Sequence, residues 1–161
     1  MKLDYVQASG YIQPLIEANS LANIANECYN YLSSLTYRSK GRCEYFAHTG
    51  FDAIAVTGMS ATIIGSIVAH KLYKNIIIVR KINDNKNNSH SNFDVEGLKN
   101  QRYIFIDDLV HSGGTLNNVI KGCSILNCKI IGAYMWQSPE FNNCLFYNNV
   151  KNLRYIKWQY R

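Results

Sequence analysis

Two adjacent acids, Asp107 and Asp108, follow an apolar run at residues 103–106 and precede a glycine-rich segment that reads HSGGT. Carboxylates in such a place need a partner, because burying an unpaired charge is costly. Sugar hydroxyls, a metal ion or a cation are their natural partners. The pattern therefore predicts a site for a polar ligand at the end of a buried strand.

The glycine-rich segment, residues 111–115, leads into a helix that apolar spacing predicts over about residues 116–126. Backbone N–H groups at a helix N-terminus face outward with partial positive charge, so they can hold a phosphate. Ser112 and Thr115 add hydroxyl donors. Carboxylates for a ribose beside amides for a phosphate describe a ribose 5-phosphate site. A plain helix cap is the alternative, and it explains a lone acid pair or glycine pair better than the whole pattern.

The elements that must position these residues alternate between strands and helices. Apolar runs predict four buried strands, at residues 52–56, 76–79, 103–106 and 129–136. Helical spacing predicts three helices, at about residues 14–35, 60–73 and 116–126. A strand, a helix and a second strand within about thirty residues are typical of a βαβ unit with a parallel sheet. Ligands of such sheets bind at the carboxyl ends of the strands, where the two acids lie.

The composition limits the class of protein. The chain has 161 residues, of which 47% are hydrophobic and 17% charged, with a formal net charge of +6. This length suits one domain, and the apolar content excludes a generally disordered chain. The basic excess fits an anionic partner, either a phosphorylated small molecule or a nucleic acid, and a solvated basic surface is the alternative.

The cysteines predict neither a zinc site nor a disulfide framework. They are irregularly spaced and form no Cys-x-x-Cys pair: Cys28, Cys43, Cys123, Cys128 and Cys144. We therefore expect a reducing, cytoplasmic compartment. No apolar signal core is visible at the N-terminus, and polar and small residues interrupt the uncharged stretch 53–69, so we expect no membrane span.

The segment YIFIDDLVHSGGT resembles the phosphoribosyl pyrophosphate (PRPP) motif of the type I phosphoribosyltransferases. Enzymes of that family displace pyrophosphate from PRPP with a nitrogenous base and form a nucleotide. The resemblance implies that Asp107 and Asp108 contact the 2′ and 3′ ribose hydroxyls. It also implies a 5′-phosphate site made of five residues: His111, Ser112, Gly113, Gly114 and Thr115.

The resemblance covers about residues 51–136 and implies the fold of that family, a Rossmann-like α/β structure with a parallel sheet flanked by helices. We expect a single domain over residues 1–161 with its core at about 51–136. A small hood that recognises the base would come from residues 1–50 and 137–161. The second of these segments is aromatic and basic, with short strand-like runs at 144–147 and 153–158.

The first predicted strand leads into Thr57, Gly58, Met59 and Ser60. Phosphoribosyltransferases of type I have a short pyrophosphate-binding loop at this place, often with a cis peptide. Small residues at a helix N-terminus let an anion approach the backbone closely, which supports the same role on physical grounds. An ordinary strand-to-helix turn is the alternative.

The second predicted strand leads into Arg80 and Lys81, which are similar to the Arg-Lys pair that contacts pyrophosphate in orotate and adenine phosphoribosyltransferases. The polar loop that follows resembles the mobile catalytic loop that closes over the site in that family and excludes water. Lys86 and His90 are its candidate cations, and Glu96-Gly97 resembles the glycine-rich return to the third strand. A solvated strand end followed by a tolerated surface insertion is the alternative.

The chain departs from the hypoxanthine-guanine enzymes of that family at two places. His111 stands where those enzymes typically carry an Asp near the purine N7. This histidine can shuttle a proton near neutral pH or help to hold the phosphate, and both interpretations stay open. Trp136 and Gln137 fall near the place of a Lys that reads the 6-oxo group, so a preference for 6-oxopurines is not implied. Both are candidate base contacts, and packing in the hood is the alternative for Trp136.

The resemblance implies a phosphoribosyltransferase of nucleotide metabolism, with purine salvage as its setting. Its substrates would be PRPP and a nucleobase, its products pyrophosphate and a nucleotide, its cofactor Mg²⁺ and its assembly a homodimer. Asp107 and Asp108 would hold the metal indirectly, through ribose hydroxyls or water. The residues expected to carry catalysis are Asp107, Asp108, His111, Arg80 and Lys81. Pyrophosphate would contact Thr57, Gly58, Met59, Ser60, Arg80, Lys81 and Lys86.

A second hypothesis is a non-catalytic or regulatory protein of the same fold that binds PRPP or a nucleotide. Contact with nucleic acid belongs to this alternative alone. Its charge would come from a sparse basic tail: Lys151, Arg154, Lys157 and Arg161. Retention of Arg80 and Lys81 favours the enzyme, since a regulator often loses such cations.

Overall fold

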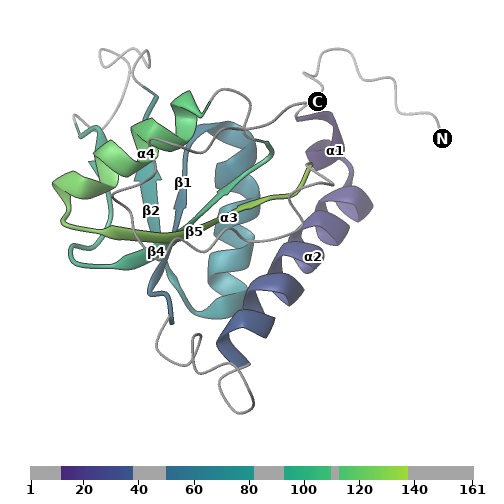
Figure 1. Cartoon of the computed structure of the whole chain (residues 1–161). Coiled ribbons are helices and arrows are strands. Elements are labelled where there is room, and N and C mark those ends of the chain that lie inside the picture. Colours follow the sequence, from purple (N-terminus) through teal and green to yellow (C-terminus); the bar gives the residue numbers. More distant parts are fainter. Residues whose placement is uncertain (1–11, 38–49, 82–92, 110–112, 138–161) are drawn as a thin grey trace, which may run out of the picture.

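The computed structural model describes residues 12–37, 50–81, 93–109 and 113–137 (Figure 1). Its helices are α1 (Gln13–Ile16), α2 (Ala18–Tyr37), α3 (Gly58–Leu72) and α4 (Gly114–Ile125). Its strands are β1 (Ala53–Val56), β2 (Asn75–Val79), β3 (Val95–Glu96), β4 (Arg102–Asp107) and β5 (Lys129–Met135). Most of the predicted hood, including the runs at 144–147 and 153–158, lies outside the described residues.

The strands form one sheet in the order β3-β2-β1-β4-β5. β1 pairs with β2 and with β4 in parallel, and β4 pairs with β5 in parallel. This confirms the predicted α/β class with a parallel sheet flanked by helices. β3 was not predicted: it pairs antiparallel to β2 over two residues, which is too short for a pattern of alternation to indicate a strand.

The sheet is covered by α4 on one face and by α3 and α2 on the other (Figure 1). Side chains of a strand alternate between the two faces. Ala53 and Ala55 therefore pack in the cluster beneath α4, while Ile54 and Val56 pack in the cluster beneath α3. Both faces of the central strands are buried, which explains why their sequences are apolar throughout rather than alternating.

Two glycines allow the helices to lie close to the sheet. A Cβ at Gly65 of α3 would collide with Val56 of β1, and a Cβ at Gly122 of α4 would lie 2.8 Å from Cγ1 of Val79 of β2. Each helix thus approaches its strand as closely as the backbone permits. α2 packs against α3 and buries Ala25, Cys28 and Leu32 at helical spacing.

No helix in the described ranges combines the length and hydrophobicity that a membrane span needs.

Some predicted boundaries were wrong by a few residues. The single helix expected at 14–35 is broken at Glu17, whose backbone is extended with ψ of 123°. α3 and α4 begin two residues earlier than predicted, because Gly58 and Gly114 join the first turn although neither contributes an apolar side chain. α3 ends at Leu72, one residue before the predicted end, with Tyr73 as its C-cap in the left-handed conformation.

Candidate functional site

Asp107 and Asp108 lie where β4 ends, at the carboxyl edge of the parallel strands. Asp107 is the last residue of the strand and only 7% exposed, and Asp108 is half-buried. The Asp108 N–H donates to Oδ1 of Asp107 at 3.0 Å, and the Leu109 N–H donates to Oδ1 of Asp108 at 2.7 Å. The backbone that leaves the strand therefore fixes the orientation of both carboxylates.

The electrostatic environment of Asp107 is unusual for an acid. Burial raises the pKa of Asp107 from its ordinary 3.8 to about 7, the charge of Asp108 adds to the rise, and the Lys81 ammonium opposes it. At neutral pH this carboxyl group can both donate and accept a hydrogen bond. Strongly shifted pKa values of this kind are concentrated at functional sites.

Ser60 connects the first turn of α3 to the acids. Its Oγ donates to Oδ2 of Asp108 at 3.0 Å. Thr57 is buried and extended at the N-cap, Gly58 adopts a φ of +72°, and Met59 is 71% exposed. Every peptide bond in the described ranges is trans, the one between Thr57 and Gly58 included. The segment predicted to bind pyrophosphate thus lies beside the acids.

The neighbours Arg80 and Lys81 occupy different surroundings. Lys81 lies over Gly58, where an added Cβ would be 3.1 Å from its Cε and 3.3 Å from its Nζ, and its charge reaches Asp107. Arg80 instead donates from Nη2 to Oε1 of Glu96 at 2.6 Å. The two cations therefore lie in different places, one over the start of α3 and the other against β3.

The N-terminus of α4 follows the acids in the sequence. Gly113 is its N-cap, buried and in the left-handed conformation with φ of +79°, which favours glycine. It has no side chain to bond the first amides, and Gly114 and Thr115 open the helix on the exposed side. Leu116 and Val119 anchor the helix in the core. Residues 110–112, which include His111 and Ser112, lie outside the described residues.

The chain leaving β5 runs beside the acids. The Gln137 N–H donates to the carbonyl oxygen of Asp108 at 2.9 Å, and the Trp136 N–H to that of Asp107 at 3.4 Å. The indole ring packs against the cluster beneath α3, and its buried Nε1 has no acceptor within the part of the chain that the structure describes. Both candidate base contacts are therefore adjacent to the acids through the backbone.

Sequence reasoning did not single out Glu96 as a partner of Arg80, because the pairing of β3 with β2 gives the only signal for it.

The predicted loop cations Lys86 and His90 lie within residues 82–92, outside the described residues. Within the described ranges no three His, Cys, Asp or Glu side chains gather as a metal site would require. Asp107 and Asp108 remain the acids that could approach a metal.

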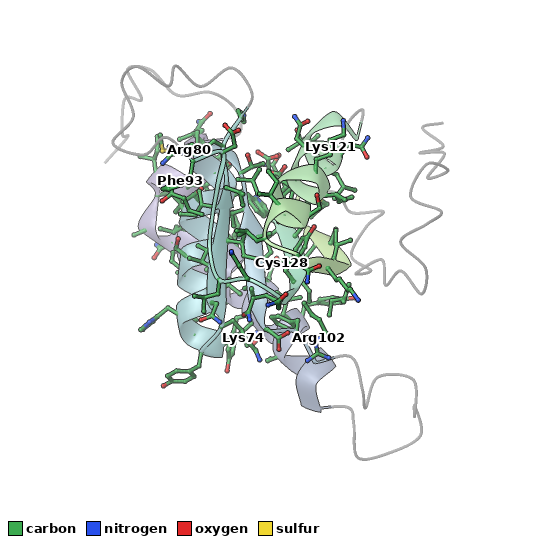
Figure 2. The ribbon with its side chains drawn as sticks, turned by 90° about the vertical axis from the view of Figure 1, so that its left-hand side faces the viewer. Lys74, Arg80, Phe93, Arg102, Lys121 and Cys128 are labelled. Carbon is green, nitrogen blue, oxygen red and sulfur yellow. The ribbon has the colours of Figure 1, made fainter. Side chains whose placement is uncertain are left out.

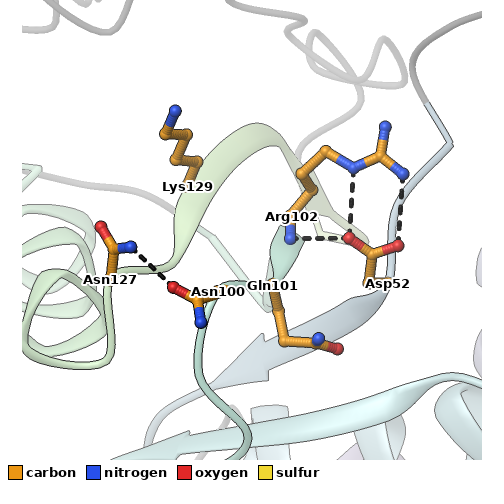
Figure 3. Close-up of a pocket in the computed structure, with 6 residues that line it drawn as sticks. All are labelled: Asp52, Asn100, Gln101, Arg102, Asn127 and Lys129. Atoms are coloured by element: carbon orange, nitrogen blue, oxygen red, sulfur yellow. Dashed lines mark hydrogen bonds and ion pairs between the residues drawn. The ribbon is translucent and has the colours of Figure 1, made fainter.

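A hollow of about 290 Å³ lies at the opposite edge of the sheet, where β1, β4 and β5 begin (Figure 3). It is lined by Asp52, Asn100, Gln101, Arg102, Asn127 and Lys129. Arg102 bonds Asp52 through Nε at 3.1 Å and through its backbone N–H at 2.9 Å, and Asn127 donates to Asn100 at 2.6 Å. Figure 2 shows Arg102 and Lys74 at one end of the sheet and Arg80 at the other. The hollow is thus separate from the acids.

Comparison with known proteins found no matching family model and no matching curated protein. Solved structures do match. UMP synthase of Leishmania donovani is 19% identical with a TM-score of 0.53, over 83% of this chain and 26% of that one. Adenine phosphoribosyltransferase of Saccharomyces cerevisiae is 14% identical with a TM-score of 0.53, over 74% and 68% of the two chains. That of Rhodothermus marinus is 15% identical with a TM-score of 0.51, over 81% and 74%.

These likenesses concern the fold. The chain has the architecture of the phosphoribosyltransferase structures, while it spans about a quarter of the length of the UMP synthase. Any catalytic activity must therefore be inferred from the side chains at the carboxyl edge of the sheet.

Proposed function

We propose that this chain is a phosphoribosyltransferase, which transfers ribose 5-phosphate from PRPP to a nucleobase and releases pyrophosphate. One observation carries the proposal: the acid pair Asp107-Asp108, buried at Asp107 and half-buried at Asp108, lies where β4 ends, with the first turn of α3 beside it and α4 following it in the chain. A ligand that joins a sugar to anionic groups on both sides matches this arrangement. PRPP is such a ligand, with a ribose between a 5′-phosphate and a diphosphate.

The ribose would lie against the acids. Asp108 is fixed by Ser60 and by the backbone amide of Leu109, so it presents a preformed acceptor. Asp107, with a pKa of about 7, would gain hydrogen bonds from ribose hydroxyls that offset its burial. The 5′-phosphate would lie at the N-terminus of α4, on the amides around Gly113, Gly114 and Thr115. His111 and Ser112 complete that segment in sequence.

The diphosphate would lie on the side of Lys81. The ammonium of Lys81 is over Gly58, at the N-terminus of α3, so a side-chain cation and helix amides converge there. Arg80 follows β2 beside it. Two cations and a helix N-terminus suit a leaving group that carries several negative charges.

Mg²⁺ fits this donor set as a metal shared with substrate. It is commonly bound through one or two carboxylates, several waters and substrate phosphates, rather than by a cage of protein ligands. Asp107 and Asp108 would hold it indirectly, through water or ribose hydroxyls. When bound, the metal would neutralise charge on the diphosphate.

The reaction breaks the bond from ribose C1 to the diphosphate oxygen, and pyrophosphate leaves with the electron pair. A ring nitrogen of the base forms the new bond to C1 and, where it carries a proton, releases that proton to the departing pyrophosphate or to water. The protein would supply position and charge rather than covalent chemistry. Asp107 and Asp108 would orient the ribose, and Lys81 and Arg80 would stabilise negative charge on the departing group.

The proposed acceptor is a nucleobase. The solved phosphoribosyltransferase structures and the positions of Trp136 and Gln137 support this proposal. The yeast adenine phosphoribosyltransferase was solved in complex with an imino-altritol bisphosphate and adenine. In this chain the backbone of Trp136 and Gln137 is hydrogen-bonded to that of the acids, so both would be near the ribose and could contact the base. Purine salvage, a cytoplasmic location and a homodimer belong to the same proposal.

The test is pyrophosphate release from PRPP and Mg²⁺ with a panel of bases: adenine, guanine, hypoxanthine, xanthine, uracil, orotate and nicotinamide. We expect one base to give stoichiometric pyrophosphate and the matching nucleotide, and no release without a base. Absence of release with every base, together with PRPP-dependent thermal stabilisation, would instead favour the non-catalytic PRPP-binding protein. Absence of both would overturn the site.

A further inference from the structure

We propose that Glu96 is a positioning residue, which holds the guanidinium of Arg80 at the carboxyl edge of the sheet for the diphosphate of the substrate. This inference rests on the proposed function. It adds a role for an acid on β3, a strand whose existence the sequence pattern did not indicate.

The pairing of β3 with β2 brings the two residues together. Ile78 is opposite Glu96, and Val79 is opposite Val95. Side chains that are opposite each other on paired strands share a face, and the guanidinium of Arg80, just beyond the end of β2, reaches Glu96. The Arg80 N–H also donates to the carbonyl oxygen of Asp94 at 2.9 Å. Backbone and side chain of Arg80 are thus both tied to the returning strand.

The ion pair leaves Arg80 able to bind a second anion. One nitrogen, Nη2, bonds Oε1 of Glu96 at 2.6 Å, and a guanidinium has five N–H donors. Nε of Arg80 is buried and has no acceptor among the described residues. A buried N–H without an acceptor is costly, and such groups are rare except where a ligand or water completes the bond. A phosphate oxygen would complete it here.

Stability alone does not account for this pair. The two side chains are 32% and 39% exposed, and ion pairs at that exposure contribute little to folding. An arginine that is already oriented, however, does not lose its conformational freedom when the substrate arrives. Lys81, the neighbouring cation, lies over Gly58 at the N-terminus of α3.

The experiment compares Glu96→Ala and Glu96→Gln with the wild type by calorimetric titration with inorganic pyrophosphate, alongside kcat and KM for PRPP. We expect Glu96→Ala to weaken pyrophosphate binding about tenfold and to lower kcat/KM similarly, because a displaced cation loses its geometry. Glu96→Gln keeps an acceptor oxygen for Nη2 and should lose less. Binding of the nucleoside monophosphate product, which lacks the diphosphate, should not change. Glu27→Ala, which removes an exposed acid of α2, controls for net charge.

The double variant Arg80→Ala/Glu96→Ala decides whether Glu96 acts through Arg80. Under the proposal it binds pyrophosphate as weakly as Arg80→Ala alone. Additive losses, unchanged binding in Glu96→Ala, or tighter binding in that variant would each overturn the positioning role. If Glu96→Ala does not fold, Glu96→Asp replaces it, because the shorter side chain withdraws the carboxylate from Arg80 by one methylene. Unchanged pyrophosphate binding in Glu96→Asp would then overturn the positioning role.

The two proposals fail separately. Wild type that binds pyrophosphate but forms no nucleotide would contradict the transferase, while the loss in Glu96→Ala would still support the positioning role. Wild type that forms nucleotide, with Glu96→Ala binding as tightly, would contradict the positioning role alone. Wild type that does not bind pyrophosphate would overturn both.

Discussion

Polar side chains are arranged differently at the amino and carboxyl edges of the sheet. At the amino edge the groups pair with one another: Arg102 with Asp52, Asn127 with Asn100, and Asn75 with Gln101. At the carboxyl edge Asp107 stands next to a second acid and is buried. The buried side-chain nitrogens that lack an acceptor in the described ranges, Arg80 Nε and Trp136 Nε1, both follow strands at that edge.

The difference separates a polar surface that stabilises the fold from one arranged for a ligand. Hydrogen-bonding to Arg102 lowers the pKa of Asp52, while burial raises that of Asp107. Both acids lie at ends of the central parallel strands, but Asp107 is buried, whereas the side chain of Asp52 is 36% exposed. The two also differ in their neighbours, because Asp52 pairs with a guanidinium and Asp107 lies beside a second acid.

The largest effect is expected from the double variant Asp107→Asn/Asp108→Asn. Two hydrogen bonds to charged groups are worth about 1.5–3 kcal/mol each, so PRPP binding should weaken by roughly 100-fold or more. Calorimetry with PRPP measures this, and the thermal midpoint verifies folding. Asp52→Asn at the amino edge is the matched control and should bind normally. Undiminished binding in the folded double variant would refute the assignment of the acids.

A smaller effect is expected from one lysine at each edge. Lys81→Ala should lower kcat/KM for PRPP by roughly 10- to 100-fold, because it removes a cation from the leaving group. Lys129→Ala removes the same charge from the amino-edge hollow and should leave kcat/KM unchanged. Steady-state kinetics at fixed ionic strength compares them. Equal losses would mean that net charge, rather than position, attracts the substrate.

The stability of the protein should depend on pH through Asp107. Its pKa is about 7 in the folded chain and near 3.8 when unfolded, so the folded state binds a proton that the unfolded state releases between pH 4 and pH 7. The free energy of unfolding should therefore fall across that window as pH rises, by up to about 4 kcal/mol, because each tenfold change in proton affinity corresponds to about 1.4 kcal/mol. Asp107→Asn should remove this fall. Urea titrations at pH 5 and pH 8 test it, and an identical fall in both proteins would contradict the shift.

The smallest effect is expected at the amino edge. Arg102→Ala removes the partner of Asp52, but the pair is largely solvated, with side chains 44% and 36% exposed. The free energy of unfolding at pH 7 should drop by about 0–1 kcal/mol. Because the pKa of Asp52 is lowered on folding, this contribution exists above pH 4 and disappears as pH falls below it. A loss that persists at pH 3 would indicate packing rather than charge.

The sequence predicted the architecture because the central strands are buried on both faces. Runs such as residues 53–56 are apolar throughout, and helical spacing between them implied parallel pairing. β3 could not be predicted, since two residues carry no periodicity and their pairing depends on β2. For the same reason the partner of Arg80 was not evident before the sheet was known.

The candidate site was predicted unevenly. The acid pair and the glycine-rich start of α4 are contiguous in sequence, so their spacing alone indicated a ligand site. The bond from Ser60 to Asp108 joins residues 48 positions apart and requires the parallel pairing of β1 with β4. The separate places of Arg80 and Lys81 depend on contacts with Glu96 of β3 and Gly58 of α3, which are distant in the sequence.

The close contact between Gly122 of α4 and Val79 of β2 bears on the length of ligand that the proposed site would accept. In the proposed site the N-terminus of α4 would hold one anionic group, and Val79 directly precedes Arg80 and Lys81, which would hold the other. With no Cβ at Gly122, α4 lies close to β2, and any larger residue at 122 would force the two apart. The distance between the two proposed anion sites would therefore change with a substitution in the C-terminal half of α4. A residue that contacts neither anionic group would thus help to determine the length of the ligand that the site accepts.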